Sequence, residues 1–183
     1  ALGEEDFRDR LVPYLADAYP DPTGEALQAP LVSAESFDEL SAREQEILNA
    51  AAPLIQTRIQ MLRECRDMLG FLFVSDAELT IDDKAVAKLK VSAGDVLDAG
   101  IHALEGLGPE QWGRGQLEEA LSAAIVEGQG MPNGEGIKPR LAYGPLRVAV
   151  TGRQVSPPLF ESMEILGAGS TLARLKALRA RLG

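Results

Sequence analysis

The chain has 183 residues and carries 18 basic against 28 acidic side chains, which gives a formal net charge of −10. Hydrophobic residues make up 45% of it, enough to build a core, so a wholly disordered chain is excluded. A charge of −10 also argues against nucleic-acid binding, because phosphate contacts favour a basic surface.

The first predicted element is a helix near the N-terminus. Its apolar stripe has helical spacing and consists of Phe7, Leu11, Tyr14 and Leu15. Pro13 lies inside this stripe and predicts a bend or a late start of the helix. The stretch 19–24 is rich in proline, aspartate and glycine, which predicts a loop.

Two helices are expected between residues 41 and 73. Ser41 and Glu44 have the spacing of a capping box, which predicts a helix through Ala51. Pro53 suits the first turn of a second helix, which would run to about Phe73.

Several shorter helices are expected after residue 79. Capping-box patterns at Thr80–Asp83 and Ser92–Asp95 predict the start of two of them. The helical pattern is interrupted at Gly106–Pro109, and Gln116–Val126 again has an amphipathic helical pattern. The glycine-rich stretch 128–136 predicts a loop.

The last part of the chain begins with an ambiguous segment. Leu146–Val150 has β-like composition but is too short to assign by periodicity, and we expect it to be helical or irregular. Ser156 is a good N-cap and Pro157 suits position N1, so a helix is predicted to start there. A final helix is expected near 170–182.

Together these elements predict an all-α fold of about seven to nine helices with short connections. We expect a bundle or cage of two helical subdomains, residues 1–79 and 80–183, that meet near residues 75–82. The sequence contains no apolar run of the ~18 residues that a membrane span needs, so no membrane partner is expected.

The N-terminus favours a cytoplasmic protein. Acidic residues at positions 4–6 stand where a signal peptide has its basic region. The sequence also begins at Ala1 without an initiator methionine, so we expect a processed chain or a piece of a longer one.

The sequence lacks a catalytic constellation. Cys65 and His102 are the only cysteine and histidine, which excludes an internal disulfide, a zinc finger and any site that needs two histidines. His102 lies in an apolar pattern and is expected to be buried or half-buried. Cys65 is more consistent with a small residue on an apolar helix face than with a nucleophile. No catalytic residue, metal ligand or cofactor site is therefore predicted in this chain.

The charge is unevenly distributed. Residues 137–183 contain eight basic and two acidic side chains, a net charge of +6, whereas residues 1–136 carry −16. Arg174–Arg181 are explained as cations that complement the negative end of a final helix. That explanation leaves out Arg140, Arg147 and Arg153, which lie in sequence rich in glycine and proline.

Two of these arginines precede the helix start predicted at Ser156. Arg147 and Arg153 together with free N–H groups and a hydroxyl would form a site for an anion or a base edge. The alternative is a well-capped helix with two surface arginines, and spacing alone favours that alternative.

Two blocks of sequence are far more specific than these short patterns. The downstream block comprises Pro145–Gly152 (PLRVAVTG), Ser156–Phe160 (SPPLF), Ile165–Gly167 (ILG) and Leu172–Leu175 (LARL). The upstream block is Leu54–Phe73. In order and spacing, from about Phe7 to Leu182, both blocks resemble the C-terminal region of bacterial glutamyl-tRNA synthetases.

The resemblance implies an all-helical anticodon-binding region in two subdomains, which would bind the anticodon loop of tRNA-Glu. In that family a Rossmann domain upstream binds ATP and glutamate, with magnesium as a cofactor. Its two signature motifs, one rich in histidine and one in lysine and serine, are absent from this sequence. The chain is therefore expected to recognise tRNA, as a monomer, without activating glutamate by itself.

The resemblance also implies particular contacts. Arg58 matches an arginine that reads the third anticodon base, a cytosine in tRNA-Glu. Arg147 and the turn around Ser156, Pro157 and Leu159 match positions that contact the first two bases, and Arg153 is expected to contact a phosphate. Anticodon loops present unstacked bases, which proteins read through base edges, stacking and rigid turns.

A second hypothesis is a helical protein-interaction domain that shares this fold but does not bind tRNA. It is motivated by the −16 charge of residues 1–136 and by Pro158, which stands where the family often has glycine and lacks an N–H donor. Binding to tRNA at low salt, where electrostatic attraction is strongest, separates the two hypotheses. Whether the enzyme would also charge tRNA-Gln is left open.

Overall fold

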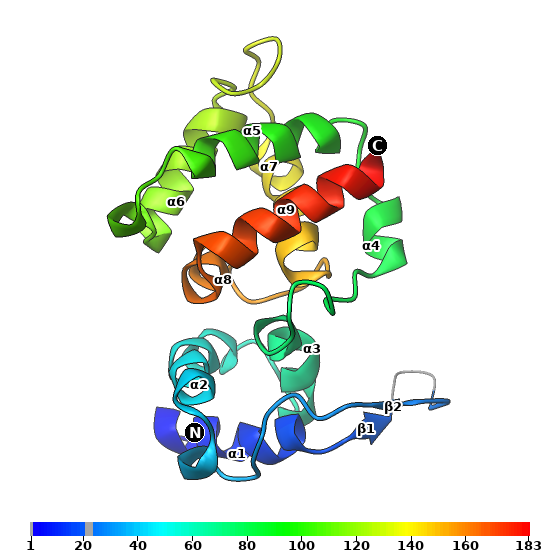
Figure 1. The fold of residues 1–183 in the computed structure, drawn as a ribbon, viewed down its shortest axis with the longest axis vertical. Coiled ribbons are helices and arrows are strands. Elements are labelled where there is room, and N and C mark those ends of the chain that lie inside the picture. The colour runs from blue at the N-terminus through cyan, green and yellow to red at the C-terminus, as the bar shows by residue number, and fades with distance from the viewer. Residues whose placement is uncertain (1, 21–23) are drawn as a thin grey trace. The chain divides into compact units, whose positions relative to one another are not determined.

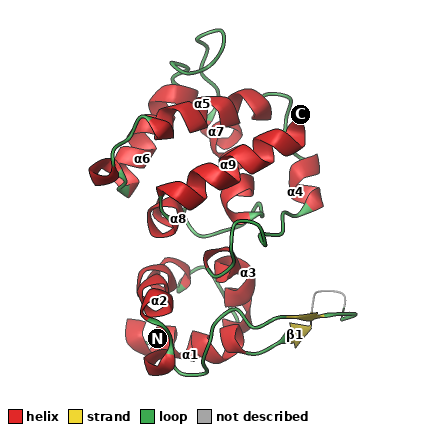
Figure 2. Cartoon of the chain, in the orientation of Figure 1, coloured by secondary structure: helices red, strands yellow, loops and turns green. Residues whose placement is uncertain are grey.

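The computed structural model describes residues 2–20 and 24–183, and the chain divides into two compact units (Figure 1). Unit 1 is Ala1–Val74 and unit 2 is Ser75–Gly183. The described residues form nine α-helices and one short two-stranded sheet, which confirms the predicted all-α class (Figure 2). The boundary between the units lies five residues before the predicted one at 79/80, and the assignment of two anticodon-binding subdomains stays a prediction.

Unit 1 is built around two helices that contact each other, α1 (Glu4–Ala16) and α2 (Ala42–Ile55). Phe7, Leu11 and Leu15 of α1 are buried, as the apolar stripe predicts. Of the two alternatives for Pro13, the late start is wrong, because α1 begins at Glu4 and continues through Pro13, and the bend stays a prediction. Its first turn holds three acidic residues, which favour a helix N-terminus there.

The capping box of α2 is confirmed. Ser41 Oγ accepts from the N–H of Glu44 at 3.2 Å, and Glu44 Oε1 accepts from the N–H of Ser41 at 3.0 Å. These bonds satisfy donors that the first turn of a helix would otherwise leave unpaired. A short 3₁₀ turn, η1 (Phe37–Glu39), precedes the cap.

The prediction of two helices between residues 41 and 73 is wrong in its boundaries. Pro53 lies inside α2 and does not open a new helix. After α2 the chain turns and then forms η2 (Leu62–Glu64), α3 (Cys65–Leu69) and η3 (Gly70–Leu72). The carboxylate of Glu64 accepts from the N–H groups of Gln60 and Met61, both at 2.7 Å, and so fixes a new helix start in place of a continuous helix.

A buried arginine completes unit 1. Arg66 Nη1 donates to the carbonyl oxygens of Tyr14 and Asp17, each at 2.9 Å, at the end of α1. β1 (Tyr19–Pro20) pairs antiparallel with β2 (Leu27–Gln28) just beyond this point. Part of the loop predicted over 19–24 is thus paired strand, and its residues 21–23 lie outside the described residues.

Unit 2 contains the remaining helices, with α9 packed against α5 and α7 (Figure 1). In chain order its elements are α4 (Asp83–Ala87), α5 (Ala93–Glu105), η4 (Pro109–Gln111), α6 (Arg114–Leu121), the π-helical turn η5 (Ser122–Val126), α7 (Pro139–Thr151), α8 (Leu159–Leu166) and α9 (Ala168–Leu182). α5 approaches α7 closely at Gly100, where an added Cβ would lie 3.1 Å from Leu146 Cδ2. The ambiguous segment 146–150 is therefore helical, within α7.

Two predicted caps in unit 2 are wrong. α4 is capped by Asp82, whose Oδ1 accepts from the N–H of Lys84 at 3.1 Å, and not by Thr80. Ser92 precedes α5 but makes no side-chain capping bond, because its own backbone is already helical (φ −71°, ψ −10°).

The cations of α9 pair with carboxylates of other segments. The ion pairs are Arg174–Asp76 at 2.7 Å, Lys176–Glu105 at 3.5 Å, Arg179–Asp98 at 2.9 Å and Arg181–Asp83 at 2.6 Å. Arg179 also donates to the carbonyl of Gly183 at the end of α9, at 3.0 Å. The explanation of these residues by the helix end alone is therefore incomplete.

Candidate nucleic-acid interface

The connection between α7 and α8, residues 152–158, begins at a fixed point. Gly152 ends α7 with φ +78°, a left-handed conformation that favours glycine. Its carbonyl accepts from the N–H of Asp82 at 2.8 Å, and an added Cβ would lie 2.3 Å from Thr80 O. Only glycine fits this position without displacing the 80–82 segment. We call residues 152–158 the 152–158 loop.

Arg147 closes this loop from inside. One turn before the end of α7, its Nη1 donates to Ser156 Oγ and to the carbonyl of Pro157, the latter at 2.9 Å. Ser156 is only 7% exposed and Pro157 is buried. The guanidinium therefore joins α7 to the far end of the loop through a single nitrogen with two N–H donors, which restricts the conformations of the loop.

Thr151 reinforces the same turn. Its Oγ1 lies 2.8 Å from Arg147 O and 3.2 Å from the N–H of Arg153. The hydroxyl can donate to the first and accept from the second, so the backbone on both sides of Gly152 is hydrogen-bonded. The result is a short loop with a defined course.

The predicted helix start at Ser156 and Pro157 is wrong. α8 begins at Leu159 with Pro158 at the N-cap position, because the Ser156 hydroxyl is engaged with Arg147. Leu159 is 3% exposed as the first residue of α8. The structure thus brings Arg147, Ser156 and Pro157 together. They bond to one another and do not form the predicted helix N-terminus with free N–H groups.

The exposed part of the loop is Arg153, Gln154 and Val155. Val155 is 73% exposed, which is unusual for an apolar side chain. A guanidinium, an amide and an apolar side chain are suited to hydrogen-bond and cover an unstacked base. Sequence reasoning missed Gln154 and Val155; their only signal is a position between Gly152 and the Pro157–Pro158 pair.

Arg58 belongs to unit 1 and lies in the turn after α2, not in a helix as expected. Its backbone N–H donates to Ile55 O at 2.8 Å, and its side chain is exposed. The turn therefore presents the guanidinium to solvent from the end of α2.

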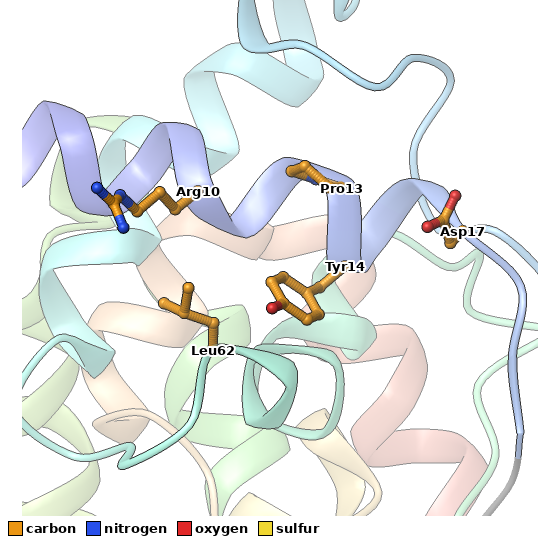
Figure 3. Close-up of a pocket in the computed structure, with 5 residues that line it drawn as sticks. All are labelled: Arg10, Pro13, Tyr14, Asp17 and Leu62. Atoms are coloured by element: carbon orange, nitrogen blue, oxygen red, sulfur yellow. The ribbon is translucent and has the colours of Figure 1, made fainter.

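A pocket in unit 1 lies between α1 and η2 (Figure 3). Tyr14 and Leu62 face each other there, while Arg10 and Asp17 lie toward its two ends along α1. Its lining combines apolar surface with the opposite charges of Arg10 and Asp17.

The single cysteine and the single histidine of the chain differ in exposure. Cys65 is fully buried, and burial raises the pKa of its thiol to about 12, so it is protonated at neutral pH. His102 is exposed on α5, which corrects the expectation that it is buried. In the described part of the chain, histidine, cysteine and acidic side chains form no group of three or more that could hold a metal ion.

A helix that spans a membrane must be both long and continuously apolar. Within residues 2–20 and 24–183, no helix meets that requirement.

A family model described as "Anticodon binding domain" matches residues 6–179, which is nearly the whole chain. The chain belongs to this anticodon-binding domain family. The domain is also 50% identical to a glutamate–tRNA ligase of Kineococcus radiotolerans over 181 residues, which are 99% of this chain and 32% of that protein. A glutamate–tRNA ligase of Kocuria rhizophila is 49% identical over 181 residues, covering 99% of this chain and 31% of its own length. The anticodon-binding domain thus spans about a third of these relatives.

Solved structures share the fold of the anticodon-binding domain. A glutamate tRNA ligase from Elizabethkingia meningosepticum matches 100% of this chain and 30% of its own with a TM-score of 0.66 at 16% identity. A glutamate-tRNA synthetase from Elizabethkingia anophelis matches 78% of this chain and 25% of its own with a TM-score of 0.55 at 18% identity. The family model and the two ligase sequences confirm the resemblance given by the sequence, and the solved structures show the same fold.

Proposed function

We propose that this anticodon-binding domain is the C-terminal part of a glutamate–tRNA ligase and binds the anticodon loop of tRNA-Glu. The observation that carries the proposal is the identity of about half of its residues, over nearly its whole length, to glutamate–tRNA ligases. The parent enzyme would join glutamate to tRNA-Glu with ATP and magnesium, held by a catalytic domain. The residues of this chain would contribute recognition of the tRNA.

Within unit 2 the proposed contacts divide by exposure. Arg153, with Gln154 and Val155, would meet the RNA, because these side chains face solvent. Arg147 would act mainly by holding the loop in shape, since its Nη1 is bound to Ser156 and Pro157. A loop held in one conformation loses less entropy on binding.

The other residues of the predicted site support these contacts. Leu159 and Ser156 are buried, so they would position the 152–158 loop and not touch a base. Arg58 is the proposed contact in unit 1, because its exposed guanidinium can present a fork to the edge of a cytosine.

Binding of the anticodon stem-loop of tRNA-Glu, measured by fluorescence anisotropy at low salt, tests the proposal. Arg153→Ala or Arg58→Ala should cost about 1–3 kcal/mol if the arginine contacts a base, and the decrease should depend on the identity of that base. A decrease of similar size for every stem-loop would indicate a phosphate contact.

The chain offers matched controls. Arg140 is exposed at the opposite end of α7, and Arg63 is another exposed arginine of unit 1, on η2. Replacing either with alanine removes the same charge and should leave the base preference unchanged. If the unsubstituted chain does not bind the stem-loop at low salt, the proposal is wrong and the protein-interaction hypothesis is favoured.

We also propose that the domain acts in the cytoplasm and as a monomer. The exposed large apolar side chains come from separate elements and do not indicate one extended interface; they are Leu2, Leu27, Met61, Val91, Leu141 and Val155. Light scattering on the purified chain tests the oligomeric state, and a dimer would contradict this part of the proposal.

A further inference from the structure

The segment that forms α4 and the turn after it has a composition unlike the rest of the acidic body. Residues 84–91 contain three lysines and no acidic residue. Lys84, Lys88 and Lys90, which we call the α4 lysine cluster, lie within seven residues of one another. Lys84 and Lys88 are exposed and four residues apart, so they lie near the same face of the helix.

This cluster lies beside the 152–158 loop. Lys88 Nζ donates to Gln154 Oε1 at 3.3 Å, which joins the end of α4 to the exposed part of the loop. The N–H of Asp82 donates to Gly152 O at 2.8 Å, which joins the start of α4 to the beginning of the loop. Two contacts from different ends of the α4 segment thus hold it against the loop.

Three acidic residues near the cluster are engaged with other groups. Asp82 caps α4, Asp83 pairs with Arg181 at 2.6 Å, and Asp76 pairs with Arg174 at 2.7 Å. In the described residues the three lysines form no ion pair with a carboxylate. Their charges therefore add to a local positive field next to the loop, although the chain as a whole is acidic.

We propose that the α4 lysine cluster binds backbone phosphates of the RNA whose bases meet the 152–158 loop. A lysine ammonium is a compact point charge that suits phosphate and carries no base information. The 152–158 loop would contact the bases, whereas the α4 lysine cluster would attract the RNA backbone and fix its position along the loop. This inference rests on the proposed function and adds the surface that holds the RNA backbone.

The test measures the affinity of the chain for the tRNA-Glu anticodon stem-loop over a series of salt concentrations. Each phosphate contact that a substitution removes should reduce the slope of log affinity against log salt by about 0.7–0.9. Lys84→Gln and Lys90→Gln are the informative single variants, because the loop bond of the cluster is made by Lys88. The triple variant with Lys88→Gln should reduce the slope by about 2 and weaken binding at moderate salt by about tenfold to hundredfold.

The matched control is Lys176→Gln, which removes a lysine that pairs with Glu105 at the end of α5. Its slope should equal that of the unsubstituted chain. Lys88→Arg keeps the charge and should keep the slope, whereas Lys88→Gln removes the charge and should reduce it. Circular dichroism checks that each variant is folded.

The outcomes separate the two proposals. If the unsubstituted chain does not bind the stem-loop, both are overturned. If it binds but the triple variant keeps its slope and affinity, the phosphate surface alone is overturned. If the triple variant loses affinity equally for stem-loops with altered anticodons, while Gln154→Ala changes the base preference, the division between α4 and the loop is supported.

Acetylation of lysines with and without RNA gives an independent measurement. Lys84, Lys88 and Lys90 should be protected by the stem-loop, and Lys176 should react equally in both samples. Equal reaction of all four lysines in the two samples would contradict the inference.

Discussion

The basic side chains of α9 and those of the α4 lysine cluster differ in what surrounds them. Along α9 each of the four cations named above forms an ion pair with a carboxylate of another segment. Beside the 152–158 loop, three lysines form no ion pair in the described residues, and Asp76, Asp82 and Asp83 are engaged with other groups. A positive surface therefore arises where carboxylates are missing or occupied, and not where basic residues are most numerous in the sequence.

The largest expected effect separates a structural cation from a binding one. Arg174 is 2% exposed and also donates to Val150 O at 2.8 Å, so Arg174→Met should destabilise unit 2 by about 2–4 kcal/mol. Urea unfolding followed by circular dichroism measures the change. The salt slope for RNA binding by the folded variant should stay the same, and a change equal to that of a lysine variant would remove the distinction between the two groups.

The start of the 152–158 loop should be the next most sensitive point. Gly152→Ala combines a left-handed conformation with a Cβ placed 2.3 Å from Thr80 O, and should cost about 2–3 kcal/mol of stability. Gly144→Ala is the matched control, because it lies in the same helix with nothing within 4 Å of its Cβ. That variant should be stabilised by up to about 1 kcal/mol through helix propensity, so similar decreases in both would contradict the packing described for Gly152.

Arg147→Lys keeps the charge but shortens the side chain by one bond. Its ammonium would fall short of the Nη1 position that donates to both Ser156 Oγ and Pro157 O, so a decrease in stability of about 1 kcal/mol is expected. The loop would be less ordered, so the ratio of affinities for stem-loops with different anticodons should decrease. The slope of log affinity against log salt should stay nearly the same, because the charge is kept. Arg140→Lys, at the exposed start of α7, is expected to change neither quantity.

The smallest expected effect concerns the ion pair between Arg181 of α9 and Asp83 of α4. Arg181 and Asp83 are largely exposed, so Arg181→Gln should change stability by less than about 0.5 kcal/mol. The freed carboxylate of Asp83 lies next to Lys84 in the sequence and would oppose RNA phosphates there. Affinity for the stem-loop should therefore fall about twofold at low salt, whereas Lys176→Gln should have no effect.

Local sequence signals predicted those elements whose stability is local. The capping box at Ser41 and the stripe of α1 are set by neighbouring residues, and both are found in the structure. The break after α2 escapes sequence patterns because it depends on Glu64 accepting two N–H groups that precede it, a choice that helix propensity does not indicate. The pattern at Thr80 misleads since Asp82, two residues on, is the better-placed acceptor.

The candidate site was predictable only in part, because its geometry depends on contacts between residues far apart in the sequence. Resemblance and residue type indicated Arg147, Arg153 and the Ser156–Leu159 turn as one region. Which of them face solvent depends on the Arg147–Ser156 bond and on the close approach at Gly152, both of which are tertiary. The α4 lysine cluster was not predicted from the sequence, because it belongs to residues 1–136, whose net charge is −16. A net charge does not indicate which carboxylates are engaged.

Cys65 gives this chain a built-in kinetic probe. It is the single cysteine, it lies at 0% exposure in unit 1, and its thiol has a pKa raised by burial to about 12. A thiol reagent can therefore modify the native chain only as fast as unit 1 opens. The rate of thiol modification would report the opening of unit 1, while circular dichroism reports the unfolding of both units. The cooperativity between the two units can therefore be measured without introducing a further residue as a probe.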